Sequence, residues 1–335
     1  MFKSCLSTLL LFVAGALAAE RENAPPALLE GLASRAEVTA PRGTFVTEMV
    51  SLADGSTRFV QVYPPNDPKK RSRVDLVSGI GKSAWQREAG GKFITAEAGT
   101  AAFMRGHDAV RLALGNGSRP AKLTLAAPQE MGGGTVTIEF SDYRQVIGFE
   151  LPFTAVFVHS AAPNDRFIYR YTALLPFRVA PGSPSPAGAT DPASLFERLG
   201  DLAELAAAHE RIMAAHRGSD ADMLTADAAE RTTVSGRGRL TEARREEHVA
   251  RMREYLGALR FARYVDTAVP VIAVANDGSL AWLACEMDAA GVRTLDGKTE
   301  PVAYAFSWVE LYSLEVDAAD RRTWQGIGNA SSQRP

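Results

Sequence analysis

The stretch from Leu280 to Val316 reads LAWLACEMDAAGVRTLDGKTEPVAYAFSWVELYSLEV, and it decides the fold of the second half of the chain. Its Asp296-Gly297 dipeptide lies between two runs of residues. In both runs, large apolar residues alternate with small or polar ones at the period of two that strands have. The stretch therefore predicts two long antiparallel strands, Leu280–Asp288 and Val302–Val316.

The second of these strands has an aromatic face. Every second residue along it falls on one side, which carries Val302, Tyr304, Phe306, Trp308, Glu310 and Tyr312. Two interpretations stay open. The rings line a cavity in which Glu310 is the polar point, or they pack on a helix and leave Glu310 at a rim.

The first strand carries Trp282 and Glu286 on one face. If the hairpin is centred near Leu295, Trp282 lies opposite Trp308. Glu286 then lies opposite Tyr304. A carboxylate on an aromatic wall has a raised pKa and suits acid–base chemistry, whereas a carboxylate at a sheet edge is only part of the surface. Both interpretations of Glu286 stay open.

A long helix is expected before the hairpin. Asp191-Pro192 is typical of a helix start, with Asp as the N-cap and Pro in the first turn, and Gly218 ends the helix. Met213 belongs to its apolar stripe, and His209 falls beside that stripe. His209 is therefore either a packed or rim histidine, or a general base that points inward.

Two more helices and a sheet are expected to complete this half. The helices run from Ser219 to about Glu230 and from Thr241 to about Leu259. A strand at Val269–Ala275 then precedes the hairpin, and Thr323–Ser331 closes the chain. Helices followed by an antiparallel meander predict the α+β fold class.

A linker separates this half from the first. Residues 180–192 read APGSPSPAGATDP, a composition that is typical of linkers. It divides a β-rich domain, residues 24–179, from a second domain, residues 193–335. In the first domain we expect short helices within residues 24–40 and 98–114. Strands are predicted at residues 44–50, 58–63, 121–126, 135–143, 151–158 and 166–174.

The N-terminus is typical of a secretory signal peptide, residues 1–19. Lys3 precedes an apolar run from Leu6 to Leu17, and small residues follow at a cleavage site near Ala18 or Ala19. The apolar run is too short to span a membrane. We therefore expect a periplasmic or secreted protein, with no transmembrane span in the mature chain.

Composition excludes several functions. The 335 residues carry a net charge of −2, with no strongly basic segment, so nucleic acid is not an expected partner. Cys285 is the one cysteine left after cleavage and is expected to be inert packing in a strand. His209 and His216 lack a third ligand at a suitable spacing, so neither a metal site nor a cofactor is expected.

Residues 191–335 resemble the nuclear transport factor 2-like, or SnoaL-like, superfamily. The resemblance rests on the order of four segments, residues 216–220, 277–282, 307–312 and 328–331. It implies a cone-shaped α+β barrel, in which a curved sheet wraps around helices and leaves a cavity open at one end. Members include isomerases, dehydratases, hydrolases and modules without chemistry. None of the catalytic sets of its enzymes transfers residue by residue.

The first domain resembles the lipoprotein-carrier (LolA-type) and outer-membrane lipoprotein-sorting family. The resemblance rests on residues 43–45, 81–86, 140–146 and 148–152. It implies an antiparallel incomplete β-barrel over an apolar cavity that holds acyl chains. Residues 64–68, PPNDP, depart from the strand spacing of that family.

We therefore expect an exported two-domain protein that binds small apolar ligands or lipid, with no evident catalytic set. The first alternative is an enzyme that performs acid–base chemistry in the C-terminal pocket. The second is an assembly module that forms a homodimer through the C-terminal sheet. The candidate pocket residues are His209, Met213, Trp282, Glu286, Tyr304, Phe306, Trp308 and Glu310.

Overall fold

The computed structural model describes most of the chain beyond residue 28. The described residues are 29–41, 43–53, 56–62, 73–79, 84–88, 92–95, 110–114, 120–127, 133–147, 149–181, 183, 189, 191–236, 239–318 and 322–333. The predicted signal peptide, residues 1–19, lies outside them. None of the described helices is both long and apolar enough to cross a membrane.

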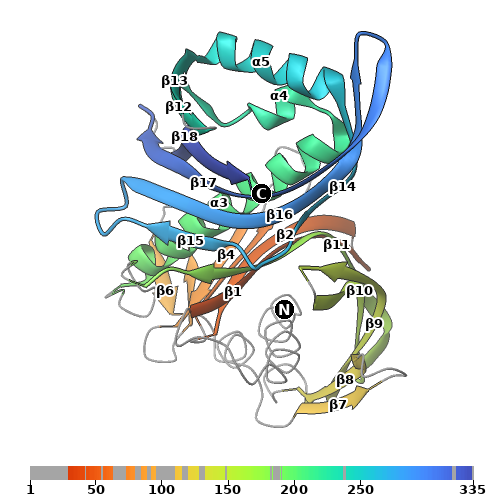
Figure 1. Ribbon diagram of the computed structural model, residues 1–335. Coiled ribbons are helices and arrows are strands. Elements are labelled where there is room, and N and C mark those ends of the chain that lie inside the picture. Colours follow the sequence, from red (N-terminus) through yellow and green to blue (C-terminus); the bar gives the residue numbers. More distant parts are fainter. Residues whose placement is uncertain are drawn as a thin grey trace. The chain divides into compact units, whose positions relative to one another are not determined.

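The chain is predominantly β, so the α+β fold class that we expected is wrong. The described residues contain eighteen strands and only three helices, and the strands pair both antiparallel and parallel (Figure 1). Several stretches with helix-like composition are strands, because cross-strand pairing and burial outweigh a weak local preference for helix.

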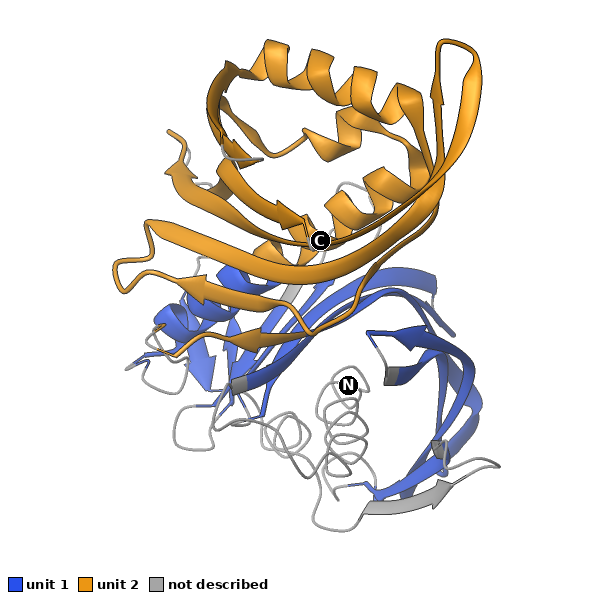
Figure 2. Ribbon diagram, viewed as in Figure 1, with its two compact units in different colours: residues 1–176, 185–203 blue, residues 177–184, 204–335 orange. Residues whose placement is uncertain are grey.

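The chain divides into two compact units (Figure 2). Unit 1 comprises Met1–Pro176 and Ser185–Ala203, and unit 2 comprises Phe177–Pro184 and Glu204–Pro335. The chain therefore passes between the units more than once, within the eleventh strand, after Pro184 and within the first described helix. The predicted boundaries around residues 180–192 stay a prediction.

Unit 1 is an antiparallel sheet. Its strands are β1 (Leu29–Ala40), β2 (Gly43–Leu52), β3 (Thr57–Val62), β4 (Arg73–Ser78), β5 (Ala84–Arg87), β6 (Phe93–Thr95), β7 (Val110–Leu114), β8 (Pro120–Ala126), β9 (Thr135–Val146), β10 (Phe149–His159) and β11 (Ala162–Val179), whose end belongs to unit 2. Their pairings give the order β6-β5-β4-β3-β2-β1-β11-β10-β9-β8-β7. Where the structure describes them, the strands predicted for the first domain lie within this sheet.

The two helices predicted in the first domain are wrong where the structure describes them. Residues 29–40 form β1, which pairs with β2 at ten successive positions from Gly31 to Ala40. Ala36 and Val38 are buried, whereas Arg35 and Glu37, which alternate with them along the strand, are exposed. This alternation has the period of a strand, which the helix-like spacing of Leu29 and Leu32 concealed in the sequence. Likewise, Val110–Leu114 is strand β7.

Unit 2 wraps a mixed sheet around helices (Figure 1). Its elements are α3 (Pro192–Gly218, shared with unit 1), α4 (Ala221–Leu224), β12 (Ala228–Gly236), β13 (Arg239–Arg244), α5 (Arg245–Ala258), β14 (Leu259–Asp266), β15 (Val271–Val274), β16 (Leu280–Leu295), β17 (Lys298–Val316) and β18 (Arg322–Gln333). The strand order is β13-β12-β18-β17-β16, and β14 and β15 pair with different parts of β16.

The start of α3 is confirmed in detail. The Asp191 carboxylate accepts hydrogen bonds from the backbone N–H groups of Ala193 and Ser194, at 2.9 and 3.0 Å. These are two of the N–H groups that a helix start leaves without partners. The helix ends at Gly218, as the sequence predicts.

The two later helices are shorter than predicted. The second helix, α4, is a single turn capped by Asp220 rather than Ser219, and residues 228–236 continue as a strand. Thr241 lies in strand β13, so α5 begins only at Arg245. Strands β12, β13 and β14 were therefore missed.

The predicted hairpin is confirmed, but its register is wrong by three residues. The turn lies at Asp296-Gly297, and Trp308 pairs with Cys285 rather than with Trp282. Trp282 instead faces Leu311. Because the shift is odd, it places Trp282 and Trp308 on opposite faces of the sheet.

Candidate functional site

Unit 2 contains a pocket with a volume of about 340 Å³. The walls come from α3, α4, β12, α5, β14, β17 and β18, so the pocket lies where the helices meet the inner face of the sheet. Its lining residues are Ile212, His216, Leu224, Asp227, Ala228, Thr232, Val234, His248, Met252, Tyr255, Tyr264, Phe306, Trp308, Glu310, Leu311, Tyr312, Gly326, Gly328, Asn329 and Ser331. This volume lies near the lower end of the range for small-molecule sites, roughly 300–1,000 Å³.

Aromatic rings form one wall of the pocket. Phe306 and Trp308 are stacked, with ring centroids 5.4 Å apart. His216 stacks nearly parallel on Tyr264, at 4.2 Å. Period-two alternation along β17 brings Phe306, Trp308 and Glu310 to this wall together. A planar ring compound would match such a surface.

His216 is a neutral hydrogen-bond acceptor in this wall. Burial lowers the pKa of its imidazole to about 4, although a hydrogen bond to the Ile212 carbonyl acts in the opposite direction. The ring donates Nδ1–H to that carbonyl at 2.8 Å, because a carbonyl oxygen can only accept. This bond fixes the tautomer and leaves Nε2 as the nitrogen with a free lone pair.

Glu310 is the most buried carboxylate of the pocket, with a relative exposure of 8%. Burial raises its pKa, which nearby His209, Tyr312 and Trp308 partly oppose. The Tyr312 hydroxyl donates a hydrogen bond to it. Asn329 pairs with Glu310 across β17 and β18 and also lines the pocket. The pocket thus joins an aromatic wall to one carboxyl group of raised pKa.

Asp227 supplies a second carboxylate to the lining. It forms an ion pair with Arg211, 2.5 Å between Oδ2 and the guanidinium nitrogen. The positive charge of Arg211 offsets the negative charge of the Asp227 carboxylate. This pair therefore gives the pocket no strong net charge. A largely uncharged ligand fits this balance better than an anion does.

A buried polar group lies apart from the pocket lining. His209 is fully buried, and its Nε2 lies 3.1 and 3.0 Å from the two carboxylate oxygens of Asp266. Burial lowers the pKa of His209, but the hydrogen bond and charge of Asp266, with Glu310 and Glu210, outweigh it and leave the pKa raised. His209 is thus a buried partner of Asp266.

The structure brings three of the predicted pocket residues together and separates the others. Phe306, Trp308 and Glu310 line the pocket. The remaining five are outside its lining: His209 and Met213 are buried in the core, Tyr304 is half-buried, and Trp282 and Glu286 are exposed on the other face of the sheet. Because the register is shifted by an odd number of residues, Trp282 and Glu286 lie on the face of the sheet that points away from the pocket.

Sequence reasoning missed the pocket residues on β12, α5 and β14. Thr232 and Tyr264 lie on strands that were assigned to helix or loop, and His248 and Tyr255 lie on the inner face of α5. The alternation of buried Leu259, Phe261 and Tyr264 is broken by a bulge, which concealed the strand signal of β14.

Comparison with known proteins finds likeness only among solved structures. No family model matches this chain, and no curated protein matches it. An NTF2-like protein from Rhodospirillum rubrum is 19% identical, covers 39% of this chain and 98% of its own, and gives a TM-score of 0.31. A ketosteroid isomerase-like protein from Erwinia carotovora atroseptica is 18% identical. Its match covers 40% of this chain and 97% of its own, with a TM-score of 0.32.

A third structure shows the same extent of likeness. An NTF2-like protein with a cystatin-like fold from Novosphingobium aromaticivorans is 15% identical. Its match covers 44% of this chain and 92% of its own, with a TM-score of 0.30. Two of these three solved structures are described as NTF2-like proteins, and each of the three is similar to less than half of this chain. At these identities and TM-scores, the likeness carries no implication for activity. The lipoprotein-carrier resemblance of the first domain and the homodimer stay predictions.

Proposed function

We propose that the pocket of unit 2 binds a small, planar, mostly apolar molecule with one hydroxyl group, and that the chain is an exported binding protein. The observation that carries the proposal is the cavity of about 340 Å³, walled by the stacked rings of Phe306 and Trp308. A flat ring buries apolar area against such a wall. The open volume also favours binding over a module whose cone is filled by its own aromatic residues.

Polar groups in the pocket favour a ligand hydroxyl. The free Nε2 lone pair of His216 accepts a hydrogen bond from such a group, and Tyr255 and Tyr264 in the lining provide further hydroxyls. An aliphatic acyl chain would leave these groups without partners, at a cost of about 1–3 kcal/mol each where water is excluded.

Titration with 2-naphthol, followed by its own fluorescence, tests the proposal. We expect saturable binding of one molecule per chain. Phe306→Ala removes part of the aromatic wall, about 1–3 kcal/mol of apolar burial, so the dissociation constant should rise roughly 5- to 150-fold. Mass spectrometry of the intact protein, expressed with its first 28 residues, tests export, because cleavage near Ala18 or Ala19 would shorten the chain.

Trp282→Ala is the matched control, because Trp282 is 37% exposed and lies on the other face of the sheet. Its affinity for 2-naphthol should equal that of the wild type. Phe306→Leu, which keeps more of the side-chain volume, covers the case in which the alanine variant unfolds. Binding that does not saturate, or that is equally weakened by Phe306→Leu and Trp282→Ala, would exclude this pocket as the binding site.

A second candidate function is proton transfer in the same pocket. The raised pKa of Glu310, caused first by burial, favours it, because a carboxyl group that titrates nearer neutral pH is a better general acid or base. Glu286 and His209, the other groups that the sequence suggested, do not line the pocket. Glu310 would then be the proton acceptor, with His216 as a hydrogen-bonding neighbour of the substrate.

Deuterium exchange at the α-carbon of 2-tetralone, followed by NMR, tests the second candidate. Its acidic C–H bond lies beside a planar ring system of suitable size. Exchange should be faster with the wild-type protein than in buffer, and Glu310→Gln should slow the catalysed rate by about 100-fold or more. Equal rates for the wild type and Glu310→Gln would rule out Glu310 as the base while leaving the binding function intact.

A further inference from the structure

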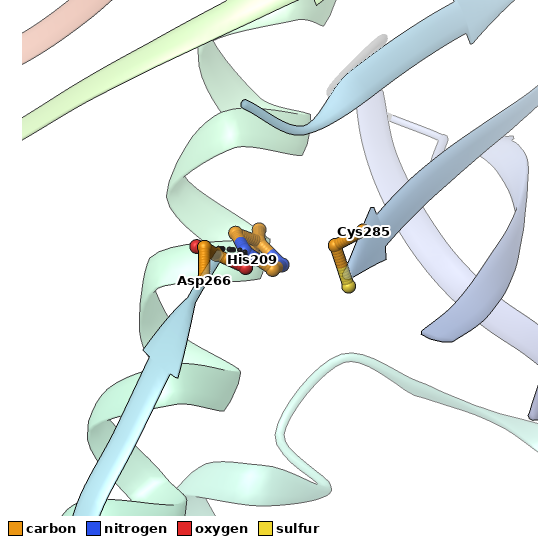
Figure 3. A group of neighbouring side chains, drawn as sticks. All are labelled: His209, Asp266 and Cys285. Carbon is orange, nitrogen blue, oxygen red and sulfur yellow. Dashed lines mark hydrogen bonds and ion pairs between the residues drawn. The ribbon is translucent and has the colours of Figure 1, made fainter. Parts of the chain in front are cut away.

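Three potential ligand atoms meet in the interior of unit 2, outside the pocket lining. His209 comes from α3, Asp266 from the end of β14, and Cys285 from β16. One ring nitrogen, one carboxylate oxygen and the sulfur all lie within 4.8 Å of one another (Figure 3). The side chains of His209 and Asp266 are 0% and 5% exposed, and Cys285 is also buried.

The donor set matches a metal ion that prefers nitrogen and sulfur. Imidazole, thiolate and carboxylate are the ligands of Zn²⁺, with bonds of about 2.0–2.3 Å. Around a tetrahedral ion these bonds place neighbouring ligand atoms roughly 3.5 Å apart. The three ligand atoms lie within 4.8 Å of one another, so movements of about 1 Å bring them to the separations found around a bound ion.

The histidine provides an independent sign of a ligand. Nδ1 of His209 is buried and has no hydrogen-bond partner, although Nε2 contacts Asp266. The imidazole ring lies between Asp266 and Cys285 (Figure 3). A buried ring nitrogen without a partner costs about 1–3 kcal/mol, a cost that a bound ion would remove.

Charge is balanced when a divalent ion enters. Without the ion, the imidazole of His209 and the carboxylate of Asp266 form a buried pair beside the thiol of Cys285. With the ion, its two positive charges face one thiolate and one carboxylate, and the imidazole is neutral. The proton on Sγ of Cys285 leaves when the thiolate binds, so the charge of Zn²⁺ is balanced by its own ligands.

We propose that His209, Asp266 and Cys285 form a binding site for one divalent, thiol-binding metal ion of the Zn²⁺ class. Sequence spacing predicted no metal site, because the histidine and the carboxylate are 57 residues apart and come together only through folding. The proposal is independent of the ligand in the pocket, since none of the three residues lines it.

Metal content and titration test the site. The full chain, stripped with a chelator, is titrated with Zn²⁺ by calorimetry and, after desalting, analysed for metal by mass spectrometry. We expect about one ion per chain, with release of at least the thiol proton of Cys285. Cys285→Ser and His209→Gln should each weaken binding at least about tenfold. Co²⁺ in place of Zn²⁺ should give the near-ultraviolet thiolate absorption band in the wild type but not in Cys285→Ser.

Asp288→Asn is the control, because Asp288 lies on the same strand but its side chain is 41% exposed and pairs with Arg263. This variant should bind Zn²⁺ as the wild type does. If the histidine or cysteine variant does not fold, the wild-type stoichiometry and Co²⁺ band decide alone. A folded wild type without bound Zn²⁺ or a thiolate band, or unchanged binding in Cys285→Ser, would overturn the proposal.

Discussion

Gly291→Ala should destabilise the chain by about 3 kcal/mol or more. An added Cβ at Gly291 would lie 2.0 Å from the carbonyl oxygen of Arg260 and 2.9 Å from Cα of Phe261. Both atoms belong to the backbone of β14, which pairs with β16 at this point. No side chain can rotate to relieve the overlap, so the two strands must separate.

Urea unfolding followed by circular dichroism measures this loss. Gly257→Ala is a matched control, since Gly257 lies in α5 and an added Cβ there meets no atom within 4 Å. Alanine is the better helix former, so this control should be as stable as the wild type or up to about 1 kcal/mol more stable. A Gly291→Ala variant within about 0.5 kcal/mol of the wild type would show that the close approach of β14 and β16 is not as described.

Asp266→Asn should cost about 3–5 kcal/mol where His209 is charged, because it leaves a buried imidazolium without its counter-ion. The pH dependence follows from the raised pKa of His209. The pair stabilises the fold fully below the unfolded pKa of about 6.5, and this contribution is lost as the pH rises through the folded pKa. The gap between variant and wild type should therefore shrink at alkaline pH.

Urea unfolding in the presence of a chelator, at pH values below and well above about 6.5, separates this effect from metal binding. Asp288→Asn serves as the control again, because a half-exposed ion pair is worth at most about 1 kcal/mol. A gap that stays constant across the pH range would mean that His209 is neutral in the folded protein.

Local sequence signals predicted the elements that depend on neighbouring residues. Asp191-Pro192 and Gly218 marked the ends of α3, and the alternation on either side of Asp296-Gly297 predicted the β16–β17 hairpin, although not its register. The face of β17 that carries Phe306, Trp308 and Glu310 followed from a period of two. These features are set by caps, turns and alternation, which a sequence shows directly.

Local sequence signals gave wrong predictions where the partner strand is distant in the sequence. Residues 29–40 contain leucines at helix-like spacing, yet they pair with β2. The register of β16 against β17 depends on where the turn closes, and an error of three residues moved Trp282 to the wrong face. The partner strand therefore decides whether a segment forms a strand and in which register it pairs. A local sequence pattern carries no information about that partner.

The sequence by itself determined the long helix α3, the β16–β17 hairpin and the aromatic face that forms one wall of the pocket. Only the tertiary structure decided the β-dominated fold, the register of the hairpin and the remaining walls of the pocket. It also decided the meeting of His209 with Asp266 and Cys285. Hairpins and caps are local, whereas these features require residues from separate elements to be packed together, and that packing is fixed by burial of the whole core.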